Sequence, residues 1–314
     1  MKRFKTTLVI LIAMGTFANA SAQAKKRFKG KPIEAGITFG GSNYMGDLST
    51  GVATNETHLM GGLICRFNYN DFITLRGNAV FGQISGNDQN FKSEIAFQHL
   101  DQAGNPLDIT RGQRNLNFKS NLVEFSAIGE WNILGFGETT RATPATPFLF
   151  AGIGVFKFNP RTQFNYMPGM VDAQGQALHN VQLEQYDKEW IELQTLGTEG
   201  QGTTKYNDRK RYNLTQVSIP LGIGYKQQVD EFWAWGIELG VRKTFTDYID
   251  DISTNYPNPG EISTEAENMS NKTGIPLPKI AGKQRGDSTR KDLYVFTGFT
   301  ISYKLSKEEI CRVF

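Results

Sequence analysis

The sequence predicts an all-β protein, a small transmembrane β-barrel of about eight antiparallel strands with long extracellular loops. Three observations predict it. Short stretches alternate apolar residues with small or charged ones, the connections between these stretches alternate in length, and an export signal precedes them. Because successive side chains of a strand point to opposite faces, each stretch has one apolar face and one small or polar face.

Residues 1–22 are predicted to be a secretory signal peptide. Lys2, Arg3 and Lys5 supply its positive start, an apolar run follows, and small residues up to Ala22 form the cleavage pattern. We therefore expect export, cleavage near Ala22, and a mature protein in the outer membrane.

The mature chain divides into three predicted parts. Residues 23–32 form a basic periplasmic leader, residues 33–305 form the outer-membrane barrel, and residues 306–314 form a C-terminal periplasmic tail. The chain has a formal net charge of +3, which indicates no nucleic-acid partner. No second long apolar run follows the signal, which excludes a helical membrane protein, whereas a barrel strand needs only about ten residues.

The predicted strands share one pattern. In the first of them Ile33, Ala35 and Ile37 alternate with Glu34 and Gly36. In a water-soluble barrel the large residues would point inward and glycine outward, so the apolar face fits lipid better and the small or charged face fits a narrow lumen. The expected strands are 33–42, 58–69, 72–84, 120–133, 147–157, 215–227, 231–244 and 292–305.

Two strands fit this pattern less well. In 147–157 the large side chains Phe148 and Phe150 lie on the same face of the strand as glycines. In 215–227 Pro220 cannot donate a ladder hydrogen bond, and we expect a bulge there.

The connections support the same topology. Long polar segments at 85–119, 158–214 and 245–291 alternate with short turns around Asn70–Asp71 and Asp230. Outer-membrane barrels have long external loops and short periplasmic turns, so the long segments are predicted to be extracellular.

The inward face carries acids and bases in similar number. An eight-stranded barrel is only wide enough for side chains to fill it, and unpaired charges would be costly there. We therefore predict a structural plug of ion pairs rather than a proton or ion path. The predicted members are Glu34, Arg66, Arg76, Glu124, Glu130, Lys226, Glu238, Arg242 and Lys304.

No spacing of His58, His99 and His179 supports a catalytic site, so we expect no enzyme activity, no cofactor and no small-molecule substrate. The carboxylates of Asp247, Asp250 and Asp251 could hold calcium, but a solvated loop is the favoured interpretation and no metal is predicted. The thiols Cys65 and Cys311 are expected to be free, with a disulfide as the alternative.

Several segments resemble the PorG family, outer-membrane barrels of the type IX secretion system. The resemblance spans nearly the whole mature chain, and its segments include Gly40–Leu48, Phe148–Pro160, Leu193–Gly202, Glu238–Asp251, Gln284–Asp287 and Tyr294–Gly298. It implies a non-enzymatic barrel that anchors or organises a periplasmic ring built from a PorK-like lipoprotein and a PorN-like protein, in support of secretion and, in some relatives, gliding motility.

The resemblance further implies that the periplasmic surface contacts that ring. By topology the candidate contacts lie in the leader, the short turns and the tail: Lys25, Lys26, Arg27, Asn70, Asp71, Asp230, Cys311 and Phe314. The alternative is a free-standing barrel whose long loops bind external surfaces or cells.

Overall fold

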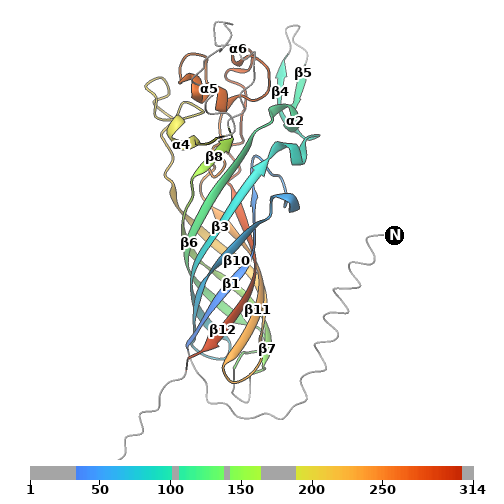
Figure 1. The fold of residues 1–314 in the computed structure, drawn as a ribbon, viewed down its shortest axis with the longest axis vertical. Helices are drawn as coiled ribbons and strands as arrows, with labels where there is room; N and C mark the ends of the chain where they lie inside the picture. The colour runs from blue at the N-terminus through green and yellow to red at the C-terminus, as the bar shows by residue number, and fades with distance from the viewer. Residues whose placement is uncertain (1–32, 101–105, 138–141, 164–188, 306–314) are drawn as a thin grey trace, which may run out of the picture.

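Eight long strands form a closed antiparallel barrel in the computed structural model, which describes residues 33–100, 106–137, 142–163 and 189–305 (Figure 1). The predicted fold class is confirmed. The strands are β1 (Ile33–Met45), β2 (His58–Asn68), β3 (Ile73–Asn87), β6 (Asn117–Asn132), β7 (Ala145–Lys157), β10 (Thr215–Gln228), β11 (Trp233–Thr244) and β12 (Leu293–Lys304).

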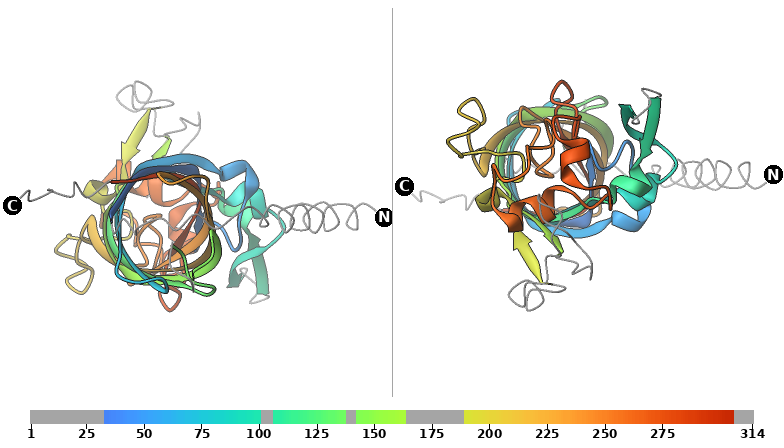
Figure 2. Two further views of the ribbon diagram at one scale, coloured as in Figure 1. Left: turned by 90° about the horizontal axis from the view of Figure 1, so that it is seen from below. Right: turned by 90° about the horizontal axis from the view of Figure 1, so that it is seen from above.

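Each barrel strand pairs with the next barrel strand along the chain, and the pairing of β1 with β12 closes the ring. The order is β3-β2-β1-β12-β11-β10-β7-β6, with β6 pairing back to β3. This up-and-down arrangement leaves these strands with no free edge, which is why a single sheet can be stable in lipid. The view from below in Figure 2 shows the closed ring.

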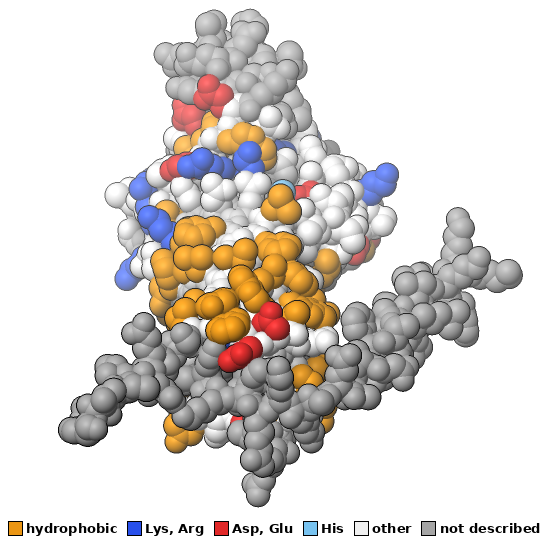
Figure 3. Space-filling model, turned by 60° about the horizontal axis from the view of Figure 1, so that its bottom comes forward, with side chains coloured by type: hydrophobic (Ala, Val, Ile, Leu, Met, Phe, Trp, Pro, Cys, Tyr) orange, Lys and Arg blue, Asp and Glu red, His pale blue; other side chains and the backbone are white. Residues whose placement is uncertain are grey.

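The inside and outside of the wall follow the predicted alternation. Along β1, Ile33, Ile37 and Phe39 are exposed, whereas Glu34 and Thr38 are buried. Large exposed apolar side chains gather in a belt around the wall (Figure 3). A slip of one residue would turn every charged residue of a strand toward the outside, so this pattern fixes the register.

The bulge expected at Pro220 is absent. The register of β10 runs unbroken past this residue on both sides, and Pro220 lies opposite Arg242 on β11. Between Thr215 and Gln227, only Ile219 and Pro220 lack a partner on β7. The strand therefore accommodates proline by losing pairing locally rather than by inserting a residue.

The two ends of the barrel differ, and we call them the turn end and the cap end. At the turn end lie the three short connections and both ends of the described barrel, where the backbone N–H of Leu305 donates to the carbonyl of Ile33 at 2.9 Å. At the cap end the long connections fold into a compact layer that lies across the opening when seen from above (Figure 2).

The described residues of the cap form only short elements: η2 (Thr54–Glu56), η3 (Asp88–Phe91), β4 (Ile95–Leu100), β5 (Pro106–Thr110), α2 (Arg111–Arg114), β8 (Pro160–Gln163), β9 (Trp190–Glu192), α4 (Leu193–Leu196), α5 (Thr264–Ser270) and α6 (Leu277–Ile280). None of the helices in the described ranges has the length and apolarity needed to cross a membrane.

The sequence suggests an inward face of small and charged residues, but the structure places apolar residues on part of that face. Toward the cap end the inward positions carry Tyr44, Phe118, Phe156, Tyr294 and Phe296, which form one apolar cluster. Tyr44 meets Phe118 edge to face at 4.8 Å between ring centroids, and Phe156 meets Tyr294 at 5.2 Å. The lumen therefore has an ionic part and an aromatic part.

The packing predicts that replacing two different glycines with alanine has unequal effects on the free energy of unfolding. A methyl group at Gly222 would overlap the carbonyl oxygen of Leu239 and the ring of Phe150, whereas one at Gly77, on the outer wall, would meet nothing within 4 Å. We expect Gly222→Ala to lower the free energy of unfolding by about 1–3 kcal/mol and Gly77→Ala to change it by less than about 0.5 kcal/mol. Urea titration followed by heat-modifiable gel migration measures both, and equal effects would contradict the assigned inward face of β10.

Candidate functional site

Glu130 is the centre of the charged part of the lumen. Its carboxylate lies 3.1 Å from Arg66 Nε, 3.0 Å from Arg76 Nη1 and 2.7 Å from Lys226 Nζ. The four side chains come from β6, β2, β3 and β10 and are all buried. A carboxylate among three cations is stable in such a place only because further acids balance them.

Two more carboxylates supply that balance. Glu34 lies 3.8 Å from Arg66 and accepts hydrogen bonds from Asn68 at 2.8 Å and Ser302 at 3.0 Å. Glu238 pairs with Arg76. Three acids and three bases thus form one connected group, which suits a structural plug.

Phe136 closes the turn end of this ionic group, and the sequence analysis did not identify it. The Lys226 ammonium lies 4.8 Å from the centre of its ring and the Lys304 ammonium 5.2 Å from it. Lys304 also donates to Gln228 at 2.9 Å. The backbone N–H of Phe136 donates to the Asp71 carbonyl at 2.7 Å, which fixes the loop.

Toward the cap end a second, smaller group joins the ionic and aromatic parts. Arg242 Nε lies 3.4 Å from Glu124, and the Tyr294 hydroxyl donates to the same carboxylate at 2.8 Å. The Arg242 guanidinium also lies 4.3 Å from the centre of the Phe296 ring. The predicted lumen residues therefore fall into two groups rather than one.

The weak alternation of β7 has a packing explanation. Phe148 and Phe150 point into the lumen, where a side chain at Gly222 or Gly240 would overlap the Phe150 ring and one at Gly224 the Phe148 ring. Inward glycines on two strands thus leave room for large rings from a third. The lumen is filled by ion pairs and rings, so its chemistry is structural.

The first buried group of the cap is centred on Arg285. Its guanidinium donates to Glu199 at 2.9 Å and to the carbonyl of Asp251 at 2.6 Å. Glu199 also accepts the backbone N–H groups of Ser253 and Thr254, each at 3.0 Å. The sequence analysis named the segment around Glu199 only as part of the family resemblance, and did not identify this role.

A second cap group ties the connection after β3 to the connection after β1. Arg114 grips Asp88 through two hydrogen bonds of 2.8 and 2.7 Å. The same guanidinium donates to the carbonyls of Asp47 and Arg285, each at 2.8 Å. The contact with the Arg285 carbonyl joins the Arg114 group to the Arg285 group in one hydrogen-bonded network.

The third cap group consists of the Tyr44 hydroxyl and the carboxylates of Asp250 and Asp292, and the hydroxyl proton alone cannot satisfy both carboxylates. The Tyr44 hydroxyl lies 2.7 Å from Asp250 and 2.6 Å from Asp292. One hydroxyl carries one hydrogen, so two short hydrogen bonds require that one carboxylate is protonated. Burial, followed by repulsion from Asp292, raises the pKa of Asp250 well above its ordinary value, and burial does the same for the pKa of Asp292.

The prediction of a solvated loop at Asp247, Asp250 and Asp251 is wrong. These residues are 3%, 1% and 0% exposed. They also diverge, because Asp250 meets Tyr44 while Asp251 meets Arg285. In the described part of the chain, no three His, Cys, Asp or Glu side chains lie close enough together to hold a metal ion. The calcium alternative therefore has no support. Burial raises the pKa of Asp247 to about 8.

At the turn end, two candidate contacts serve their own turns. The Asn70 side chain accepts the backbone N–H groups of Phe72 and Ile73, and Asp230 accepts those of Phe232 and Trp233. The latter hydrogen bonds lower the pKa of Asp230.

Exposed apolar neighbours are better placed to meet a partner, since Tyr69 is 71% exposed and Val229 is 65% exposed. Lys25, Lys26, Arg27, Cys311 and Phe314 lie outside the described residues, as do the signal peptide and the tail.

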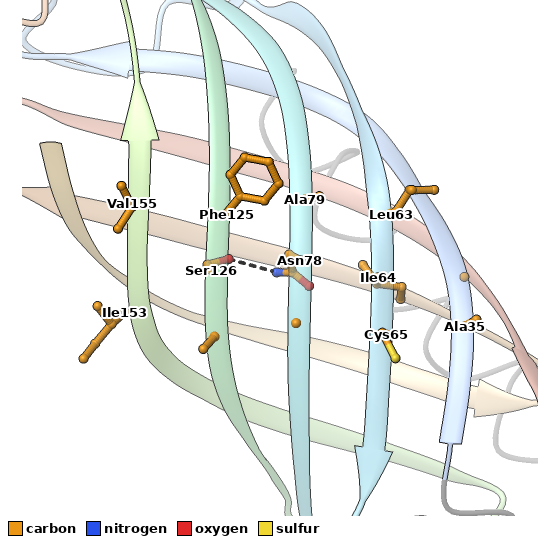
Figure 4. Close-up of a pocket in the computed structure, with 13 residues that line it drawn as sticks. Ala35, Leu63, Ile64, Cys65, Asn78, Ala79, Phe125, Ser126, Ile153 and Val155 are labelled. Atoms are coloured by element: carbon orange, nitrogen blue, oxygen red, sulfur yellow. Dashed lines mark hydrogen bonds between the residues drawn. The ribbon is translucent and has the colours of Figure 1, made fainter. Parts of the chain in front are cut away.

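The outer wall carries a shallow depression of about 760 Å³ (Figure 4). Ala35, Cys65, Gly77 and Ala127 lie opposite one another on four adjacent strands and form its floor. Larger residues such as Phe125 border it (Figure 4). Cys65 is exposed there as a free thiol.

His58 is the one histidine whose side chain lies near a hydroxyl in the described structure. Its Nε2 is 2.6 Å from Ser85 Oγ, and the Ser85 hydroxyl also meets Glu56. In a nucleophilic triad the carboxylate hydrogen-bonds to the imidazole, whereas here the Glu56 carboxylate accepts from the Ser85 hydroxyl and lies 3.9 Å from the imidazole. The arrangement therefore gives no support to a hydrolase site.

A closed ring of eight antiparallel strands, an apolar outer belt and an interior filled with ion pairs and rings define the class of small transmembrane β-barrels. Within that class, the chain belongs to the family described as a domain of unknown function, DUF6089, whose model matches residues 5–178. No curated protein matches the chain.

Several solved outer-surface barrels are similar at low identity. Neisserial surface protein A is 7% identical, with 88% of this chain and 99% of that one covered and a TM-score of 0.37. OprG, an outer-membrane protein of Pseudomonas aeruginosa, is 8% identical, with coverages of 90% and 100% and a TM-score of 0.34. Ail, the attachment invasion locus protein of Yersinia pestis, in complex with the heparin analogue sucrose octasulfate, is 8% identical, with coverages of 87% and 98% and a TM-score of 0.33.

The ionic group predicts a large effect of one neutral substitution. Glu130→Gln leaves three buried cations with two carboxylates, and we expect it to lower the free energy of unfolding by about 3–5 kcal/mol. Glu192→Gln is the matched control, because its pair with Arg161 is exposed and its loss should cost less than about 1 kcal/mol. Denaturant titration in detergent measures both. Similar small losses would show that the lumen charges are hydrated.

The protonated cap group predicts a pH dependence. The folded cap binds more protons than the unfolded chain between about pH 4 and 8, because the pKa values of Asp247, Asp250 and Asp292 are raised. Its stability should therefore be full at low pH and fall as pH rises, by up to about 1.4 kcal/mol per pH unit for each proton. Proteolysis rates of the 245–292 segment at pH 5, 7 and 9, normalised to an unfolded substrate, measure this.

Asp292→Asn should flatten that pH dependence, since an amide can donate to the Tyr44 hydroxyl without a bound proton. Asp208→Asn, at an exposed position of the cap, is the control. If the proteolysis rate of the 245–292 segment depends on pH equally in wild type and Asp292→Asn, the shared proton is excluded.

Proposed function

We propose that the protein is a non-enzymatic outer-membrane barrel of the type IX secretion machinery, which anchors or organises a periplasmic ring of PorK-like and PorN-like subunits. The filled lumen is the observation that carries the proposal. Glu130 and Phe136 occupy its turn-end half and aromatic rings its cap-end half, so nothing folded passes through it. Such a barrel acts through its surfaces.

The outer belt supports a location in lipid. Ile37, Leu63, Phe125, Ile223 and Ile237 are all more than half exposed on different strands. Soluble proteins rarely expose an apolar area that runs around the whole molecule. The predicted export signal directs such a barrel to the outer membrane.

The cap supports the link to the PorG family. The segments that carry the resemblance contribute Tyr44, Glu199, Asp250, Asp251 and Arg285, and these residues meet in the cap groups. The resemblance therefore lies in residues that act together in three dimensions, and the role in secretion is inferred from it.

The turn end is the surface that we propose for the ring. We expect the double variant Tyr69→Ser, Val229→Ser to reduce the ring subunits that co-purify from detergent-solubilised membranes by at least about tenfold, equivalent to about 1.4 kcal/mol. The reason is that both side chains are exposed and apolar and lie in the short turns of the turn end, which we propose faces the periplasm. Quantitative mass spectrometry, normalised to the barrel, measures the change.

Val52→Ser is the matched control, because Val52 is an exposed apolar residue of the connection after β1 at the cap end. Heat-modifiable migration verifies that each variant is folded. Undiminished ring subunits in the double variant, or an equal loss in the control, would place the contact elsewhere.

A second candidate function is binding of an external surface through the loops. A polar depression of about 720 Å³ on the cap, lined by Arg209, Lys210, Tyr248, Asn255 and Asp287 among others, favours it. Replacing Lys210 and Asn255 with alanine should then abolish adhesion of cells and spare secretion, whereas unchanged adhesion would exclude this depression.

A further inference from the structure

Three lysines on the outer wall lie near the cap-end border of the apolar belt. On β7, Lys157 is the next outward residue after Val155. On β11, Lys243 is the next outward residue after Val241, and Lys291 lies one outward step before Leu293 of β12. Alternate residues of a strand share a face, so each lysine stands directly above an aliphatic side chain on the same face of the wall.

The register brings these lysines to one side of the barrel. Lys243 lies opposite Leu293, two residues from Lys291. Strands β7, β10, β11 and β12 are consecutive in the ring, so the three lysines span one continuous arc of the wall. We call Lys157, Lys243 and Lys291 the basic arc. On the face shown in Figure 3, Lys and Arg side chains lie above the apolar belt.

The charges of the basic arc are available to a ligand. All three lysines are exposed, and none has a carboxylate within 4 Å among the described residues. The Lys291 ammonium donates only to a backbone carbonyl, that of Ser288, at 2.8 Å. The described turns at the opposite border carry the acidic residues Asp71 and Asp230.

We propose that the basic arc binds the phosphate groups of the anionic glycolipid of the outer leaflet, an inference that rests on the outer-membrane location in the proposed function. The aliphatic residue below each lysine contacts acyl chains, while the lysine stem extends its ammonium to the headgroup level. Compact ammonium groups attract phosphate at such a boundary, each adding to the affinity. The cation–anion match and the position above the belt select a lipid phosphate.

The test uses the purified full-length barrel in a neutral detergent, with diphosphorylated lipid A as the probe. Native mass spectrometry and titration measure lipid binding. We expect Lys157→Gln, Lys243→Gln, Lys291→Gln to weaken it at least about tenfold. The control, Lys205→Gln, Lys210→Gln, Lys279→Gln, removes three exposed lysines of the cap and should change binding less than about twofold.

Two further probes identify the ligand chemistry. Dephosphorylated lipid A should bind as weakly to wild type as diphosphorylated lipid A binds to the arc variant, and inorganic phosphate alone should compete poorly. Equal binding of lipid A by wild type and arc variant overturns the inference, as does equal binding of the dephosphorylated lipid or effective competition by free phosphate.

The same preparations separate this inference from the proposed function. Ring subunits that co-purify with the arc variant after lipid binding is lost support a separate lipid site. Wild type that retains the ring but binds no lipid A overturns the inference alone, and a barrel that binds lipid A without any ring subunit overturns the role in secretion alone.

Discussion

The rest of the structure depends on the neutralisation of charge inside a closed ring. Once the first and last strands pair, the inward polar side chains lose their contacts with water, and neighbouring side chains must supply hydrogen bonds and opposite charges instead. Glu130 on β6 meets that constraint by pairing with Arg66, Arg76 and Lys226. These contacts hold β2, β3 and β10 at a fixed register relative to β6. The ion pairs therefore act like the core of a soluble protein, while the apolar residues face outward.

The alternation of side chains made most of the wall predictable from sequence, because a period of two is a local property. The strand bounds differ from expectation mainly at the cap end, where β1, β3 and β6 continue beyond the apolar belt. Charged residues such as Glu34 and Arg242 could be assigned to the lumen for the same reason. Their partners could not be assigned, since a partner depends on the ring geometry and not on spacing along the chain.

The features that sequence reasoning missed all depend on contacts between distant segments. Phe136 sits in a connection without periodicity, and only its place between two glycines in a polar stretch hinted at a special role. The Asp250–Asp251 pair was expected to be solvated because the surrounding loop is polar, yet Tyr44 and Arg285 cover it from segments far away in the chain. Polar composition does not distinguish a solvated loop from a buried hydrogen-bonded one.

The hydroxyl of Tyr44 spans the seam of the cylinder. Tyr44 belongs to the first strand, and Asp292 directly precedes the last strand, so their contact exists only after the ends of the sheet have joined. Asp250, in the connection before the last strand, lies 2.7 Å from the same hydroxyl. The contact of one hydroxyl with both carboxylates therefore couples closure of the cylinder to the packing of the cap loop that carries Asp250.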